Sequence, residues 1–160
     1  MGLVTEMNSQ LGQRLKDNLQ QHLDCTAVLQ STLEEEHRAL TANDAETLLR
    51  VTQTKAAAAE NLRALGDDLM RLRRDGNFAS VDAMFEAVPD AATLSQQWNE
   101  ILELATECHT ANRRNAAVLD VRQTQVRAAL EVIFPTQSAQ TYGRTGYSGG
   151  PVGTRSFGLA

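Results

Sequence analysis

Apolar and small residues recur at steps of four and three along the C-terminal part of the chain. This heptad spacing predicts one long helix from Asp90 to Phe134, and at 1.5 Å per residue such a helix spans about 60 Å. Asn112 and Asn115 interrupt its apolar stripe. The predicted seam consists of Leu94, Trp98, Ile101, Ala105, Cys108, Asn112, Asn115, Leu119, Arg122, Val126, Ala129 and Ile133.

Two earlier segments also show helical spacing. The first, from about Leu3 to Leu40, carries leucines at four-residue steps and ends at residues 41–43. The second runs from Asp44 to about Arg74 and ends at the turn signal of residues 75–77. Asn43 is expected to cap this second helix, with Glu46 reaching back to the cap backbone.

The second helix has a heptad seam of its own, with small residues in its middle. Its predicted members are Ala45, Leu48, Thr52, Lys55, Ala59, Leu62, Gly66 and Leu69. Lys55 is the odd member, and we expect its stem to be buried and its ammonium group to lie in water. A short helix between Phe78 and Pro89, capped by Ser80, is expected to close one end of the bundle.

These segments predict an all-α fold. The short turn at residues 41–43 forces the first two long helices to run antiparallel, and the third long helix returns after the short connecting helix. The expected architecture is an elongated antiparallel bundle or coiled coil of three long helices, one short connecting helix and a flexible C-terminal tail. We therefore divide the chain into a helical bundle, residues 1–134, and a Gly-rich tail, residues 135–160.

The tail differs from the body in composition. It holds six of the ten glycines, no acidic residue, and the aromatic residues Tyr142, Tyr147 and Phe157. All 20 acidic residues and 13 of the 15 basic residues lie in the body, which is therefore acidic. Such a charge disfavours nucleic acid as a ligand. No apolar run is long enough to span a bilayer and no signal peptide is recognisable, so we expect a cytoplasmic protein without stable membrane insertion.

Residues with catalytic or metal-binding chemistry are sparse. Glu34 and His37 have the Glu-x-x-His spacing of di-iron bundles, but no second copy of that motif follows, so a solvated acidic face is favoured over a metal site. Cys108 and His109 are sequence neighbours on a helix and point about 100° apart, which disfavours a nucleophile–base pair. Cys108 and Cys25 are expected to be free thiols. We predict neither an enzyme nor a cofactor.

The seam asparagines and the aromatic tail indicate a binding surface. The two asparagines either hydrogen-bond to their surroundings on a half-open face or receive a partner, and the sequence leaves both alternatives open. The tail either docks on a partner or is an inert spacer, and its aromatic residues favour docking. The candidate partner-binding residues are Asn112, Asn115, Leu119, Arg122, Val126, Ile133, Phe134, Tyr142 and Tyr147.

Three stretches resemble the FlgN-type flagellar export chaperones. They are Leu33–Leu40 followed by Asp44–Leu48, then Asn112-Arg113-Arg114-Asn115-Ala116, and then Thr141-Tyr142-Gly143-Arg144-Thr145-Gly146. The family's Asn-Asn-Gly appears here as Asn-Arg-Arg-Asn-Ala, which keeps a small residue at its end. The resemblance implies a chaperone that binds the C-terminal helices of hook-associated flagellar proteins, prevents their premature assembly and delivers them to the type III export apparatus. It further implies that Tyr142 contacts the export gate.

One alternative remains open at this point. A structural or scaffolding coiled coil would self-associate through the same seams, as a homodimer for example, and would not need the tail.

Overall fold

The computed structural model describes residues 2–134, with side chains from Glu6 onward, and these residues form helices joined by short turns. The helices are α1 (Gly2–Ala42), α2 (Ala45–Asp75), α3 (Val81–Glu86) and α4 (Ala91–Ile133). No strand occurs in residues 2–134, so the predicted all-α fold is confirmed. None of these helices is apolar over enough of its length to cross a membrane.

The chain divides into two units, residues 1–122 and residues from Gln123 onward, so the boundary falls within the sequence of α4. The predicted domain boundary after Phe134 lies at the end of the described residues and stays a prediction. The tail residues Tyr142 and Tyr147 lie outside the described residues.

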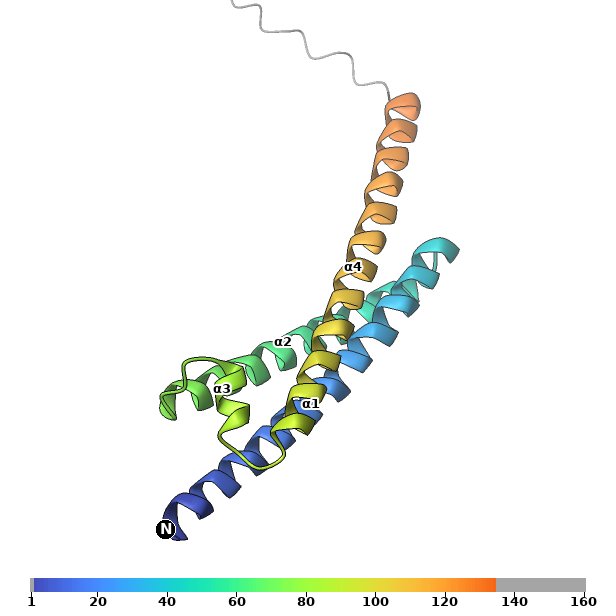
Figure 1. Cartoon of the computed structure of the whole chain (residues 1–160). Coiled ribbons are helices and arrows are strands. Elements are labelled where there is room, and N and C mark those ends of the chain that lie inside the picture. Colours follow the sequence, from blue (N-terminus) through green and yellow to red (C-terminus); the bar gives the residue numbers. More distant parts are fainter. Residues whose placement is uncertain (1, 135–160) are drawn as a thin grey trace, which may run out of the picture. The chain divides into compact units, whose positions relative to one another are not determined.

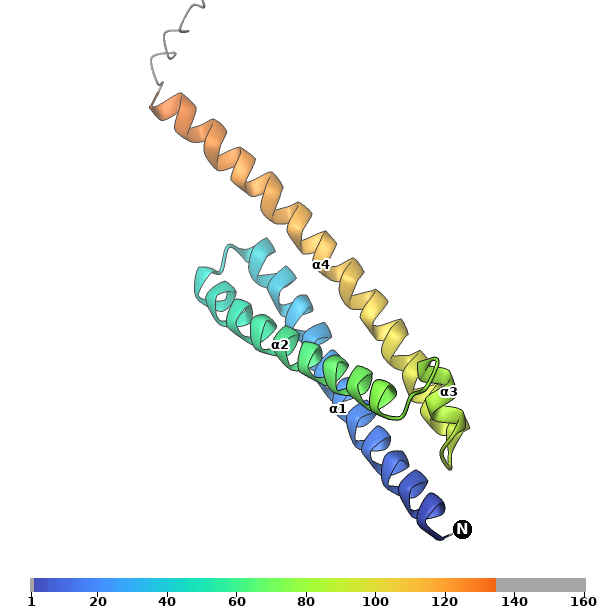
Figure 2. The same cartoon turned by 90° about the vertical axis from the view of Figure 1, so that its left-hand side faces the viewer.

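In the first unit, α1 and α2 form a closely packed antiparallel pair, as Figures 1 and 2 show. The N-terminal two thirds of α4 run beside α1 in the same direction. Thr26 of α1 lies against Cys108, the Leu33 carbonyl accepts from Asn115, and the Thr41 carbonyl accepts from Arg122. Helix α1 is therefore the central element, with α2 antiparallel and α4 parallel to it.

The turn between α1 and α2 differs from its prediction by one residue. Asn43 has a positive φ of 58° and closes α1, because the Asp44 amide donates to the Ala39 carbonyl at 3.0 Å. The N-cap of α2 is consequently Asp44, whose Oδ1 accepts from the Thr47 amide at 3.0 Å. The expectation that Asn43 caps α2 with the help of Glu46 was wrong. Asn43 ends the preceding helix instead.

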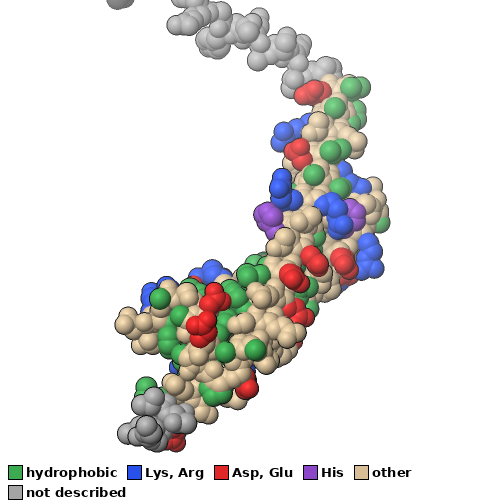
Figure 3. All heavy atoms as spheres, viewed as in Figure 1, with side chains coloured by type: hydrophobic (Ala, Val, Ile, Leu, Met, Phe, Trp, Pro, Cys, Tyr) green, Lys and Arg blue, Asp and Glu red, His purple; other side chains and the backbone are tan. Residues whose placement is uncertain are grey.

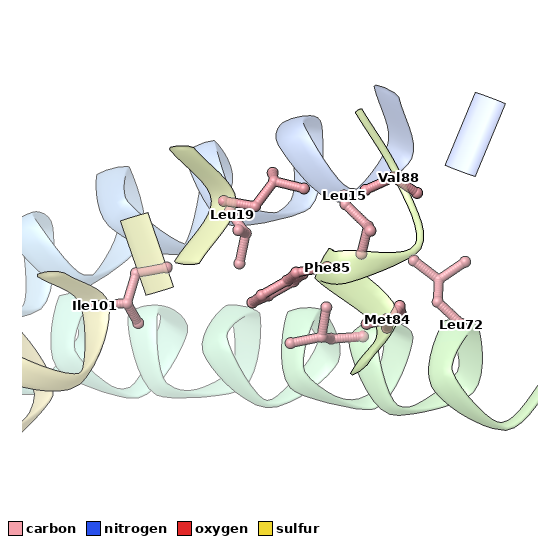
Figure 4. Close-up of a cluster of buried hydrophobic side chains, with 9 residues drawn as sticks. Leu15, Leu19, Leu72, Met84, Phe85, Val88 and Ile101 are labelled. Atoms are coloured by element: carbon pink, nitrogen blue, oxygen red, sulfur yellow. The ribbon is translucent and has the colours of Figure 1, made fainter. Parts of the chain in front are cut away.

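The short helix α3 has the predicted position and function. Ser80 caps it by accepting from the Ala83 amide at 3.0 Å, and Met84 and Phe85 are completely buried. Figure 4 shows the Phe85 ring extending between α1 and α2, near Leu19. On the face seen in Figure 3, hydrophobic side chains gather around this helix. The cluster that α3 completes consists of Leu15, Leu19, Leu69, Leu72, Met84, Phe85, Val88, Leu94 and Ile101.

Candidate functional site

Polar side chains from the three long helices meet halfway along the first unit, and we call Glu36, His37, Lys55, Asn112 and Asn115 the polar cluster. Lys55 Nζ lies 2.6 Å from Glu36 Oε1 and 3.3 Å from Asn112 Oδ1. Asn115 Nδ2 donates to Glu36 Oε2 at 2.9 Å, and its Oδ1 lies 3.1 Å from His37 Nδ1. The cluster thus joins α1 to both α2 and α4.

The two asparagines have different environments. Asn115 is 2% exposed, and its amide also donates to the Leu33 carbonyl at 2.7 Å. Asn112 is exposed, and its Oδ1 accepts from Lys55 Nζ at 3.3 Å. Of the two alternatives that the sequence left open, Asn115 follows the first: its hydrogen-bonding groups are satisfied inside the bundle. Asn115 is therefore not available on the surface for a partner.

Two expectations about charged residues were wrong. Glu36 is buried, so the Glu34–Glu36 run is not a solvated face throughout. The ammonium group of Lys55 is paired with Glu36 rather than solvated alone, and the Lys55 side chain is 29% exposed. Both corrections have one cause: a buried carboxylate requires a cation and further donors, and Lys55 and Asn115 provide them.

Arg122, another predicted binding residue, contacts the turn between α1 and α2. Its guanidinium donates to Asn43 Oδ1 and, at 3.3 Å, to the Thr41 carbonyl. These bonds satisfy a helix end that has lost its intrahelical partners. In this structure Arg122 holds the turn, and only part of its surface is open to a partner.

The segment of α4 from Gln123 onward exposes a row of large apolar side chains. Val126 is 58% exposed and Ile133 is 65% exposed, and their seven-residue spacing places them on one face with Leu130. Phe134 follows directly and is 67% exposed. We call Val126, Leu130 and Ile133 the apolar stripe. Figure 3 shows hydrophobic side chains interspersed with charged ones along this part of α4.

The two cysteines are free, with Cys108 buried and Cys25 half-buried. Burial raises the pKa of both thiols, which keeps them protonated and poorly nucleophilic at neutral pH. Among the residues that the structure describes, no group of three His, Cys, Asp or Glu side chains is placed to hold a metal ion. What the described residues expose on α4 is apolar surface.

The comparison with protein families agrees with this arrangement. A family model described as FlgN protein matches residues 7–148. The chain belongs to the FlgN family. The matched range includes the Asn112–Ala116 stretch and the Thr141–Gly146 stretch, so the resemblance stated from the sequence is confirmed. No curated protein and no solved structure matches this FlgN-family chain. Membership identifies it in general terms as a helical chaperone of flagellar biogenesis.

Sequence reasoning missed Glu36 and His37 as members of the central site. A signal was present, because Glu36 lies three residues after Leu33 and four before Leu40 and so continues the heptad spacing of α1. Leu119, predicted to bind a partner, belongs to the first unit and is 46% exposed there.

Proposed function

We propose that this FlgN-family chain binds hook-associated flagellar proteins, prevents their premature assembly and delivers them to the type III export apparatus. The observation that carries the proposal is the exposed apolar stripe of α4. Large apolar side chains on one face of a helix are costly to leave in water and are typical of surfaces that receive an amphipathic helix. The C-terminal helices of the hook-associated proteins are the proposed partners, with Phe134 extending the contact of the stripe. Leu119 stays a separate candidate in the first unit.

The first prediction concerns the stripe. The double substitution Val126→Glu and Ile133→Glu is expected to weaken the complex with a hook-associated protein at least a hundredfold, since it places two carboxylates where apolar contacts form. Titration calorimetry with the purified partner measures the change. Val132→Glu is the matched control, because Val132 points about 100° away from Ile133 on the same helix and is 82% exposed. An unchanged affinity in the double variant would remove the stripe from the proposal, and no wild-type complex at tens of micromolar would refute the function.

A second prediction concerns delivery. We include Tyr142 as the contact with the export gate, on the strength of the Tyr-Gly-x-x-Gly stretch alone. Tyr142→Ala is expected to leave the complex with the hook-associated protein intact and to lower the amount of that protein secreted by motile cells severalfold. Phe157→Ala serves as the control, because Phe157 is an aromatic residue of the same tail that is not among the candidate partner-binding residues. Equal secretion by the wild type and the Tyr142 variant would separate Tyr142 from delivery.

Self-association remains the rival function, and a homodimer is compatible with the same stripe. Light scattering over a dilution series distinguishes the two: a scaffold stays oligomeric at all concentrations and does not depend on residues 135–160. A chaperone exchanges any self-contact for its partner, so the partner would dissociate the oligomer.

A further inference from the structure

The first unit contains an apolar groove between α2 and α4, with α1 as its floor. The groove has a volume of about 530 Å³. The three helices contribute rows of residues spaced by four and three. These rows are His22, Thr26, Leu29 and Leu33 from α1, Lys55, Ala59 and Leu62 from α2, and Trp98, Leu102, Ala105, His109 and Asn112 from α4, with Ile101 and Cys108 beneath them.

The residues that α2 and α4 present to the groove have heptad spacing, but no further helix of the first unit packs against them. Along α4, every seventh residue from Leu94 to Asn115 is buried, whereas Ala105 and Asn112 of the predicted seam are exposed. Leu102 is 47% exposed and Trp98 is half-buried at the rim. Across the groove, Ala59 of α2 is exposed as well. Both α2 and α4 therefore present exposed heptad positions to the groove.

The shape and the backbone chemistry of the groove favour a helix as its occupant. Its walls are helices whose amide and carbonyl groups bond within the helix, so they offer no edge with which an extended peptide could pair. A helix satisfies its own backbone groups, and its side chains can enter holes between residues spaced by four and three. From Trp98 to Asn112 the wall of α4 covers about four turns, or about 21 Å. Ala59 and Ala105 leave room for close approach from both sides.

The charges of the groove specify the occupant further. None of the residues that line it is acidic, although the helical body of the chain is acidic. Lys55, His109 and Asn112 lie together at one end, and Glu36 below them is already paired with Lys55. At the floor, burial lowers the pKa of His22, which favours a neutral imidazole there. The groove thus complements a helix with an uncharged apolar face and a carboxylate at one end.

We propose that the groove between α2 and α4 binds an amphipathic helix of the exported protein, with two heptads of apolar residues and an acidic residue placed beside Lys55 and His109. This rests on the proposed chaperone function and adds a second contact, in the first unit, to that of the apolar stripe. The exported helix would complete a four-helix arrangement over α1, α2 and α4.

Trp98 provides a direct probe, because it is the single tryptophan of the chain and lines the groove. The ligand is a synthetic, tryptophan-free peptide of the C-terminal helix of the hook-associated protein. Its addition to the full-length chain is expected to reduce acrylamide quenching of Trp98 at least twofold. Leu102→Glu is expected to lower the affinity for the peptide at least tenfold. The variant should still fold, because Leu102 is 47% exposed. Val121→Glu is the matched control, since Val121 lies on α4, is 56% exposed and does not line the groove.

Charge gives an independent test. His109→Glu is expected to lower the affinity for the peptide severalfold. Replacing the acidic residues of the peptide by glutamine should remove most of the difference in affinity between the wild type and this variant. Equal affinity of the wild type and Leu102→Glu, or unchanged quenching, would overturn the proposal. Two other occupants would also overturn it. If a second copy occupies the groove, quenching of Trp98 without peptide should fall as the protein concentration rises. If the chain's own C-terminal segment occupies it, quenching without peptide should be low in the full-length chain and should rise when the chain is truncated after Phe134.

The groove and the chaperone function fail in different ways. If full-length hook-associated protein binds the wild type and Leu102→Glu equally well in size-exclusion chromatography, the groove proposal falls and the chaperone function stands. If the wild type forms no such complex, the function falls and the groove proposal falls with it.

Discussion

Phe85→Ala is expected to lower the free energy of unfolding by about 3–5 kcal/mol, the range for truncating a buried aromatic side chain. Phe85 is completely buried, and its ring lies 6.4 Å from that of Trp98 in an edge-on arrangement. It joins a six-residue helix to both α1 and α2 (Figure 4). Such a short helix has little stability of its own, so the loss should detach α3 as well as leave a cavity.

Urea unfolding followed by circular dichroism measures this change. Glu86→Ala on the same helix is the control and should stay within about 0.5 kcal/mol, because Glu86 is exposed. A Phe85→Ala variant that loses less than about 1 kcal/mol would show that α3 is not a structural part of the first unit.

The fold could be predicted from the sequence because heptad spacing and turn residues agree along the whole helical body. The four helices, their order and the Ser80 cap follow from local signals that tertiary packing does not oppose. Asn43 was wrongly predicted to begin α2, because an asparagine in a short turn can either end one helix or cap the next. The backbone conformation of the turn decides between the two. Here the bond from the Asp44 amide to Ala39 fixes Asn43 as the end of α1.

Which residues of each helix are buried was harder to predict, because two adjacent faces of a helix have residues in common. The predicted seam of α2 includes Ala59, which is exposed, whereas Val51, Ala58 and Leu72 are buried. The buried residues also lie at heptad-compatible spacings and share Leu69 with the predicted seam, so spacing alone cannot separate the two rows. In α1 the buried row continues through His22, Thr26 and Glu36, which a search for leucines passes over.

The environment of the candidate binding residues could be predicted only in part, for a physical reason. Val126 and Ile133 are exposed, and the spacing that places them on one helix face with Leu130 could be read from the sequence. Asn112 and Asn115 look alike in sequence, three residues apart on the same seam. Whether each amide faces another helix or water depends on how α1 and α2 lie against α4, which one helix's spacing does not contain.

Asn115→Leu should therefore be far more damaging than Asn112→Leu. We expect Asn115→Leu to lower the free energy of unfolding by about 2–4 kcal/mol, because the Glu36 carboxylate and the Leu33 carbonyl lose a donor in a place that water does not reach. Asn112→Leu removes one exposed contact with Lys55 and should change stability by less than about 0.5 kcal/mol.

A double-mutant cycle identifies the cause. Combining Asn115→Leu with Glu36→Leu should be less damaging than the two single losses added together, by about 1–3 kcal/mol, since neither partner is then left unsatisfied. Urea unfolding of the four proteins gives the coupling free energy. Additive losses would mean that Asn115 acts through its volume rather than through Glu36. A coupling of the expected size would show that Asn115 stabilises the fold through its bond to Glu36, which joins α4 to α1 beside the groove.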